Sequence, residues 1–238
     1  MGKRIVSQRR GRATRRYITL RHNYLGRARS KVSINKDIHL ARVVSLDHSP
    51  AHSAPLACVE YDDGERSYII APEGISVGDI ISVGNTNEIK TGNTLKLGEI
   101  PDGTAIYNIE QVYGDGGRYV RASGTEARIL AKVGDKVSVL MPSKKQKLFA
   151  INCRATIGKV AGGGRIDKPF IKAGNRHYAM KARGKLWPVT SAVAMNANEH
   201  PFGCGRGRHV GKPKNAPRHA PPGRKVGILY SRRTGRKR

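Results

Sequence analysis

The segment APLACVEYDDGERSYIIA, residues 54–71, carries the clearest structural signal in the chain. Two runs rich in apolar, β-branched and aromatic residues flank Asp62, Asp63 and Gly64. An Asp-Gly pair between two such runs is typical of the turn of a β-hairpin. The segment therefore predicts two antiparallel strands, over residues 54–61 and 65–71.

Further strand-like segments lie on both sides of this hairpin, and no sustained helical repeat of apolar residues interrupts them. They cover residues 38–46, 79–83, 104–113, 128–133, 136–141 and 147–152. Short strands bounded by turns favour small closed sheets. A weak internal repeat, VGDIISV at 77–83 and VGDKVSV at 133–139, favours two small barrels, each with a Gly-Asp turn that leads into a strand. We therefore expect a mainly β fold.

Charge divides the 238-residue chain into three parts. There are 45 Lys and Arg residues against 17 Asp and Glu, a net charge of +28. Residues 1–36 hold twelve basic side chains and no acid, residues 37–150 have a net charge of −3, and residues 151–238 hold twenty-one basic side chains and two acids. A chain with this much unbalanced positive charge repels itself, so the charge predicts a polyanionic partner for both ends.

Glycine and proline recur in the C-terminal part, where few stretches alternate apolar with polar residues. Residues 162–177 and 205–227 contain too little apolar surface to fold unaided. We expect extended arms that become ordered on a partner. A helix is expected at most over residues 190–197, between Pro188 and Pro201.

Composition excludes several classes of protein. No apolar run approaches the roughly 20 residues of a membrane span, and the N-terminus lacks the apolar segment of a secretory signal. The odd number of widely spaced cysteines, Cys58, Cys153 and Cys204, suits reduced thiols in a cytosol. We expect a cytoplasmic protein without a membrane partner.

The segment EHPFGCGRGRH, residues 199–209, allows three interpretations. His200, Cys204 and His209 supply three possible metal ligands, whereas a structural zinc site usually takes four. An acid–base site needs a carboxylate that holds the histidine, and Glu199 is its direct neighbour, so the two side chains point apart on an extended chain. No recognisable nucleophile or nucleotide-binding loop accompanies either histidine. Metal binding at this cluster stays open.

A phosphate-binding interpretation accounts for the whole segment. Glycine lets the backbone approach a sugar–phosphate chain closely, and arginine offers paired donors to phosphate oxygens and a plane for base stacking. Aromatic side chains elsewhere, among them Tyr24 and Trp187, suit stacking on unpaired bases. Local packing is the alternative role for each of them. The sequence favours an RNA-binding protein without an enzymatic activity of its own.

Several long stretches resemble one known family. They include SAPLACVEYDDGERSYIIAPEGISVGD at 53–79, GNTLKLGEIPDGTAIYNIE at 92–110 and the whole of residues 153–227. These segments resemble the universal ribosomal protein two of the large subunit, in its archaeal and eukaryotic form. The resemblance spans about residues 35–235 and is loose before residue 35.

The resemblance implies four parts and a set of partners. The parts are a basic N-terminal arm (1–35), an OB-type barrel (36–91), an SH3-like barrel (92–170) and a basic, Gly/Pro-rich C-terminal extension (171–238). The implied partners are large-subunit ribosomal RNA, neighbouring ribosomal proteins and, through an inter-subunit bridge, the small subunit. The implied location is the cytoplasmic ribosome, where the protein organises RNA near the peptidyl-transferase centre. No cofactor is expected, because Mg²⁺ belongs to the RNA rather than to the protein.

The resemblance and the charge pattern together predict the RNA-binding residues. The family's loop of Ala-Met-Asn, His-Pro and glycines falls on Ala194, Met195, Asn196, His200, Pro201, Gly203 and Gly205, and Cys204 interrupts its glycines. Its histidine, implicated in supporting peptide-bond formation, falls on His200, which makes a direct chemical part for His200 the alternative function. The full predicted set is Arg9, Arg10, Arg12, Arg15, Arg16, Arg21, Arg118, Arg121, Arg154, Arg165, Lys168, Lys172, Arg176, His177, Lys181, Arg183, Lys185, Trp187, Asn196, His200, Phe202, Gly203, Gly205, Arg206, Arg208, His209, Lys212, Lys214, Arg224 and Lys225.

Overall fold

A computed structural model of the chain describes residues 2–31, 38–84 and 88–229. It divides into two compact units. The first, called here the arm unit, is built from the N-terminal residues to Leu20 together with the residues from Lys172 onward. The second, called the strand unit, covers Arg21–Ile171. The helices in the described parts of the chain are too short or too polar to cross a bilayer.

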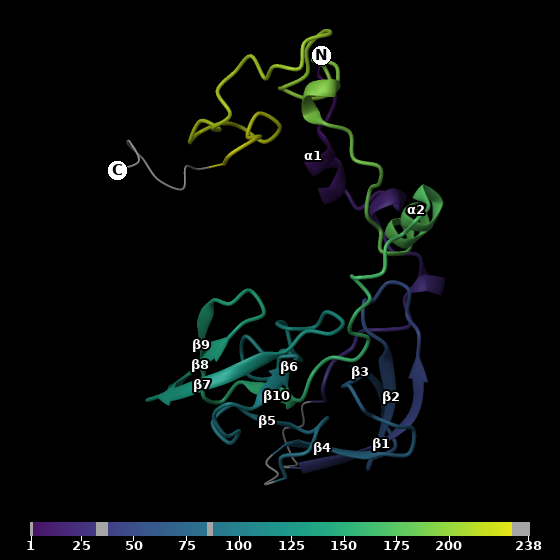
Figure 1. Cartoon of the computed structure of the whole chain (residues 1–238), viewed down its shortest axis with the longest axis vertical. Coiled ribbons are helices and arrows are strands. Elements are labelled where there is room, and N and C mark those ends of the chain that lie inside the picture. The colour runs from purple at the N-terminus through teal and green to yellow at the C-terminus, as the bar shows by residue number, and fades with distance from the viewer. Residues whose placement is uncertain (1, 32–37, 85–87, 230–238) are drawn as a thin grey trace. The chain divides into compact units, whose positions relative to one another are not determined.

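Ten strands form one sheet in the described part of the strand unit, which confirms the expected β fold (Figure 1). Their order across the sheet is β3-β2-β1-β4-β5-β10-β6-β7-β8-β9. Every neighbouring pair is antiparallel except β4 and β5, which share one parallel pairing, Val83 with Thr94. The strands are β1 (Ile38–Asp47), β2 (Leu56–Tyr61), β3 (Arg66–Ile70), β4 (Ile80–Gly84), β5 (Thr94–Lys96), β6 (Ala105–Tyr107), β7 (Ala127–Val133), β8 (Lys136–Leu140), β9 (Gln146–Ala150) and β10 (Arg154–Ile157).

The sheet falls into two strand groups, each with its own hydrophobic cluster, as expected for two small barrels, and a third cluster that includes Leu56 and Tyr107 joins the groups. Strands β1 to β4 enclose a cluster that includes Val43, Val59 and Ile81. Strands β5 to β10 enclose a second cluster around Leu97 and Val137, both fully buried. These groups lie inside the bounds predicted for the OB-type and SH3-like barrels. The four-part division of the chain itself stays a prediction.

The hairpin at residues 54–71 forms as predicted. Strands β2 and β3 are paired in register, and the Tyr61 and Gly64 amides donate to the carbonyl oxygens of Glu65 and Tyr61, each over 2.9 Å. Gly64 has φ +81°, a left-handed conformation that favours glycine at the end of a short hairpin loop.

Each copy of the Val-Gly-Asp repeat forms a turn before a strand, as predicted. Gly78 and Gly134 both have positive φ, and each turn leads directly into a strand, β4 or β8. The longest strand of each group also carries a bulge, near Val44 in β1 and near Leu130 in β7. Bulges increase the local twist, which helps a sheet to close on itself. The two turns of the repeat differ in topology, because Gly134 lies in the hairpin that joins β7 to its neighbour β8, whereas the turn at Gly78 leads into β4, which pairs with β1 and not with β3.

Three predictions about elements were inaccurate. The strand predicted over residues 104–113 ends at Tyr107, because Asn108 takes φ +50° and leaves the extended conformation. The helix expected at most over 190–197 is only a single turn, η3 (Ala192–Ala194). A ten-residue helix that was not predicted, α2 (Ala173–Ala182), lies just before it.

The arms contain several short helical elements. They are α1 (Val6–Gly11), η1 (Arg15–Tyr17), η2 (Arg21–Asn23), α2 and η3. None contains a buried residue, so packing contributes little to their formation. The arms are nevertheless in contact with each other: the Lys3 amide donates to the Asn198 carbonyl oxygen over 2.6 Å, and Ile5 packs with Phe202 and Val226. The expectation of extended arms is therefore corrected: the arms contain short helices and contact each other.

Candidate nucleic-acid interface

Most of the thirty predicted RNA-binding residues lie on the protein surface. The exposed ones are Arg9, Arg10, Arg12, Arg15, Arg16, Arg21, Arg118, Arg165, Lys168, Lys172, Arg176, His177, Lys181, Lys185, Asn196, Gly205, Arg206, Arg208, His209, Lys212, Lys214, Arg224 and Lys225. Arg121, Arg183, Trp187 and His200 are partly buried. Arg154, Phe202 and Gly203 are buried. The last group needs a different explanation.

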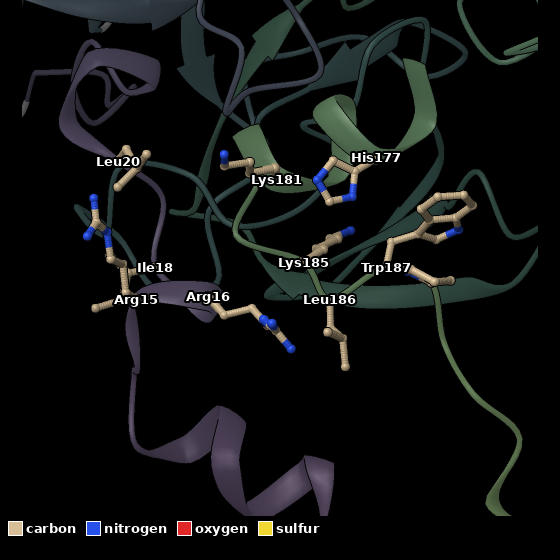
Figure 2. Close-up of a pocket in the computed structure, with 10 residues that line it drawn as sticks. Arg15, Arg16, Ile18, Leu20, His177, Lys181, Lys185, Leu186 and Trp187 are labelled. Atoms are coloured by element: carbon tan, nitrogen blue, oxygen red, sulfur yellow. The ribbon is translucent and has the colours of Figure 1, made fainter. Parts of the chain in front are cut away.

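Six of the predicted residues meet around one cavity of about 640 Å³ in the arm unit (Figure 2). Both arms contribute to its wall, because α2 and the chain after it face the segment that begins with η1. The residues that line it are Arg15, Arg16, Ile18, Leu20, His177, Lys181, Lys185, Leu186, Trp187 and Pro188. The sequence indicated the charged and aromatic members of this wall but not that the two arms share it.

A second basic cavity, of about 410 Å³, lies in the strand unit. Arg27, Arg29 and Arg121 line it, together with Tyr24 and His52. The Tyr24 and His52 rings are stacked, with centroids 5.1 Å apart and planes inclined by 24°. Burial, and then the charge of Arg121, lower the pKa of His52, so the histidine is neutral at pH 7 and leaves the positive charge to the arginines.

Arg27, Arg29 and His52 were not among the predicted residues. Arg27 and Arg29 alternate around Ala28, which is buried, and period-two spacing in an extended segment puts both arginines on the same side. That alternation within an acid-free segment was the available signal for them. No sequence signal pointed to His52, because folding of the strand unit brings this histidine to the cavity.

Arg121 is fixed in place by the protein. Its guanidinium donates to the carbonyl oxygen of Gly117 over 2.7 Å and to that of Ala28 over 2.6 Å. Gly117 has φ +91° and closely approaches the Asn108 side chain, so a side chain at this position would clash. These contacts hold the guanidinium in one orientation, which reduces the entropy it loses when it binds an anion.

Arg154 serves the interior of the strand unit instead of the surface. Its side chain is 5% exposed and forms an ion pair with Glu110, whose side chain is 3% exposed, with 2.7 Å between Nη2 and Oε1. A further donor of its guanidinium bonds the Lys31 carbonyl oxygen over 2.9 Å. Glu110 also accepts from the backbone amides of Gly114 and Gly116 and so shapes the loop before Arg121. These contacts give Arg154 a structural role, and its contact with RNA stays a prediction.

Phe202 and Gly203 are explained by packing within the arm unit. Phe202 is 9% exposed and belongs to the apolar cluster with Ile5 and Val226. A Cβ on Gly203 would lie 2.6 Å from the Met195 carbonyl oxygen, inside van der Waals contact, whereas one on Gly205 would meet nothing within 4 Å. Gly205 is thus the glycine of this pair that remains accessible to a partner.

His200 is held in a defined state by its neighbours. The backbone amide of Phe202 donates to Nδ1 of His200 over 3.0 Å, which places the proton of the neutral ring on Nε2. Burial lowers the pKa of His200, so the ring is neutral at pH 7. Nε2 is therefore a hydrogen-bond donor in this state, and Nδ1 has no lone pair left for accepting a proton.

The arrangement around residues 199–209 does not assemble metal ligands. Across residues 2–31, 38–84 and 88–229, no three His, Cys, Asp or Glu side chains gather in a way that suits a metal ion. Glu199 instead pairs with Lys3 of the other arm, with 3.3 Å between Oε1 and Nζ. The three cysteines are free thiols.

Both halves of the chain are similar in sequence to known proteins. Residues 3–83 match the family model described as "Ribosomal Proteins L2, RNA binding N-terminal domain", and residues 90–220 match "Ribosomal Proteins L2, C-terminal domain". The chain is 51% identical over 236 residues to the large ribosomal subunit protein uL2 of Haloarcula marismortui, covering 99% of this chain and 98% of the relative. It is 49% identical over 238 residues to the uL2 protein of Archaeoglobus fulgidus, covering 100% of both.

Proposed function

The chain belongs to the ribosomal protein L2 family, and from this membership we propose that its two basic arms bind large-subunit ribosomal RNA in the cytoplasmic ribosome. The strand unit contains its own hydrophobic clusters and is continuous in the chain with both arms. The function is structural, and the chemistry of its surface is phosphate and base recognition.

The observation that carries this proposal is the unopposed positive charge of the exposed arm residues. The chain before residue 37 has no acidic side chain, and the chain after residue 150 has only Asp167 and Glu199. Nineteen of the predicted Lys and Arg side chains of the whole chain, from Arg9 to Lys225, are exposed. Such a surface gains affinity for RNA by releasing the counterions condensed on the phosphates.

Finer roles follow from the family resemblance. We propose that the glycine-rich loop around His200 organises RNA near the peptidyl-transferase centre, and that the protein supports subunit association through a bridge to the small subunit. Neighbouring ribosomal proteins complete its contacts. Magnesium in this environment is bound by RNA phosphates, because the carboxylates that it prefers are nearly absent from the arms.

Salt dependence of RNA binding tests the proposal. A protein that makes about 6–10 phosphate contacts loses roughly 10³–10⁵ in affinity between about 50 and 200 mM salt. We expect a loss of this order for the purified chain on a large-subunit ribosomal RNA fragment, measured by filter binding. Equal affinity for duplex DNA of the same length, or affinity that does not change with salt, would refute the proposal.

A matched pair of variants locates the contacts. Lys212 and Lys214 lie on the C-terminal arm and Lys136 and Lys145 on the strand unit, and all four are exposed. The double variant K212Q/K214Q is expected to lower the slope of log affinity against log salt by about 2, since each phosphate contact contributes about 1. The variant K136Q/K145Q removes the same charge and is expected to leave the slope unchanged.

A direct chemical part for His200 in peptidyl transfer is the second candidate function. The observation that favours it is the neutral ring, whose Nε2–H remains a possible donor to a reacting group. Acting as a general base would require His200 to give up its bond to Phe202. We therefore favour a positioning role for this histidine.

Two substitutions separate the alternatives. H200N retains an acceptor for the Phe202 amide and removes Nε2, whereas H200Q places its amide near Nε2 and loses the acceptor at Nδ1. We expect ribosomes with H200N to assemble and transfer peptide at the normal rate, and H200Q to impair assembly. Normal assembly with slow transfer in H200N, measured by single-turnover reaction with puromycin, would favour the chemical part.

A further inference from the structure

The cavity shared by the two arms has the size of a small-ligand site. Its volume is about 640 Å³, within the range of about 300–1,000 Å³ that is common for such sites. Figure 2 shows Arg15, Ile18 and Leu20 on one side of the opening and His177 and Trp187 on the other. Because both arms supply wall residues, the cavity exists only when the arms are together.

The wall combines two kinds of surface. Ile18, Leu186 and Pro188 are apolar, whereas Arg15, Arg16, Lys181 and Lys185 each carry a positive charge. Among the residues that the structure describes, no acidic one lines the cavity. A ligand that satisfies both surfaces has a planar or apolar portion and a negative charge at its edge, which is the chemistry of a nucleotide.

Trp187 is the residue best suited to hold the planar portion. The Arg176 guanidinium lies 5.6 Å from the centre of its ring, and Arg176 is not part of the cavity wall. This cation holds the indole in place and leaves ring surface directed into the cavity. Aromatic rings stack on any unpaired base, since every base has a π face.

We propose that this cavity binds a single unstacked nucleotide of RNA, with its base against Trp187 and its phosphates on the basic side chains at the rim. The inference rests on the proposed RNA-binding function and names the form of RNA that this site takes. A base inside a duplex is stacked on both faces and does not reach an indole in a cavity. The site therefore distinguishes a bulged or looped nucleotide from a continuous helix.

Fluorescence offers a direct test, because Trp187 is the only tryptophan in the chain. The full-length protein is titrated with a short RNA hairpin that carries one bulged adenosine and, separately, with the same hairpin fully paired. We expect strong quenching with the bulged hairpin and little with the paired one, at physiological ionic strength. Equal signals from the two hairpins at saturation would overturn the proposal.

Variants assign the effect to the cavity. K181Q/K185Q removes two cations from the wall, and K212Q/K214Q removes two exposed cations from elsewhere on the same arm. We expect the first variant to lose preference for the bulged hairpin and the second to lose affinity for both hairpins equally. Measured by filter binding, because both variants lack the tryptophan signal, W187A is expected to weaken binding of the bulged hairpin by about 5- to 150-fold through loss of one stacked base, while W187F preserves most of the affinity.

The outcomes separate this inference from the proposed function. Salt-sensitive binding of both hairpins without preference, in the wild type and in W187A alike, overturns the cavity assignment and leaves RNA binding intact. Failure to bind either hairpin or a ribosomal RNA fragment overturns both. Preference for the bulged hairpin that W187A abolishes and W187F retains supports both.

Discussion

Two arginines of the strand unit have guanidinium groups in very different surroundings. Arg154 is almost completely buried and paired with Glu110, whereas Arg66 is 62% exposed in its pair with Glu60. Removing one partner of a buried pair leaves an uncompensated charge in a medium that solvates it poorly. An exposed pair is solvated and screened, so its loss matters little.

This contrast gives a prediction for stability. R154A is expected to lower the free energy of unfolding by about 3–5 kcal/mol, because it leaves the buried Glu110 carboxylate without its partner cation. R66A is the matched control and is expected to cost at most about 1 kcal/mol. Urea denaturation of each variant, monitored by the circular dichroism of its β-sheet, measures the two free energies of unfolding. A loss for R154A no larger than that for R66A would contradict the structural role of Arg154.

Residue identity alone did not reveal which arginines are buried and which are exposed. Arg154 and Arg165 are both arginines in a basic part of the chain, and the pattern predicted RNA contact for both. The structure buries the first and exposes the second, which lies 3.1 Å from the Ser123 hydroxyl. The difference depends on Glu110, forty-four residues upstream of Arg154 in the sequence, and no local pattern reports such a pairing.

At the scale of elements, alternation and turns made most strands predictable. β1 alternates exposed and buried residues over its first half, and glycine turns bound β3, β4 and β8. β5 and β10 were missed because they are only three and four residues long and β10 is buried throughout. Helix α2 was missed because it buries no residue and so shows no apolar stripe.

The glycine-rich loop combines a packing glycine with an accessible one. Gly203 is buried against the backbone of Met195 and Asn196, and the loop that includes His200 folds back on this contact. Gly205 is exposed, with open space where a side chain would be. The sequence did not distinguish them, because both glycines flank Cys204 in one glycine-rich segment.

The two glycines are expected to respond differently to the same substitution. G203A forces its Cβ into the backbone and is expected to destabilise the arm unit by about 1–3 kcal/mol, as overpacking generally does. G205A is expected to leave the stability of the free protein unchanged and to weaken RNA binding, because an added methyl keeps the RNA backbone at a distance. Limited proteolysis reports the first effect and filter binding the second. Equal protease resistance of G203A and G205A would contradict the packing role.

At the scale of the whole molecule, charge and apolar surface are separated along the chain. The near-neutral middle has the hydrophobic clusters of the strand groups, whereas the described part of the arms has the small cluster of Ile5, Phe202 and Val226. Composition alone revealed this separation, since it depends on counts over long segments. The contact between the arms was not predictable, because it joins residues nearly two hundred positions apart.

The central claim is that the arms contact ribosomal RNA. The most direct test is ultraviolet crosslinking of intact large subunits, with mass spectrometry of the peptides that carry RNA adducts. The account predicts adducts concentrated in residues 2–20 and 172–229, including Lys181 and His200. A further adduct is expected at Arg165, which precedes the second range in the sequence. Adducts confined to the strands β1 to β10, with the arms crosslinked only to protein, would contradict it.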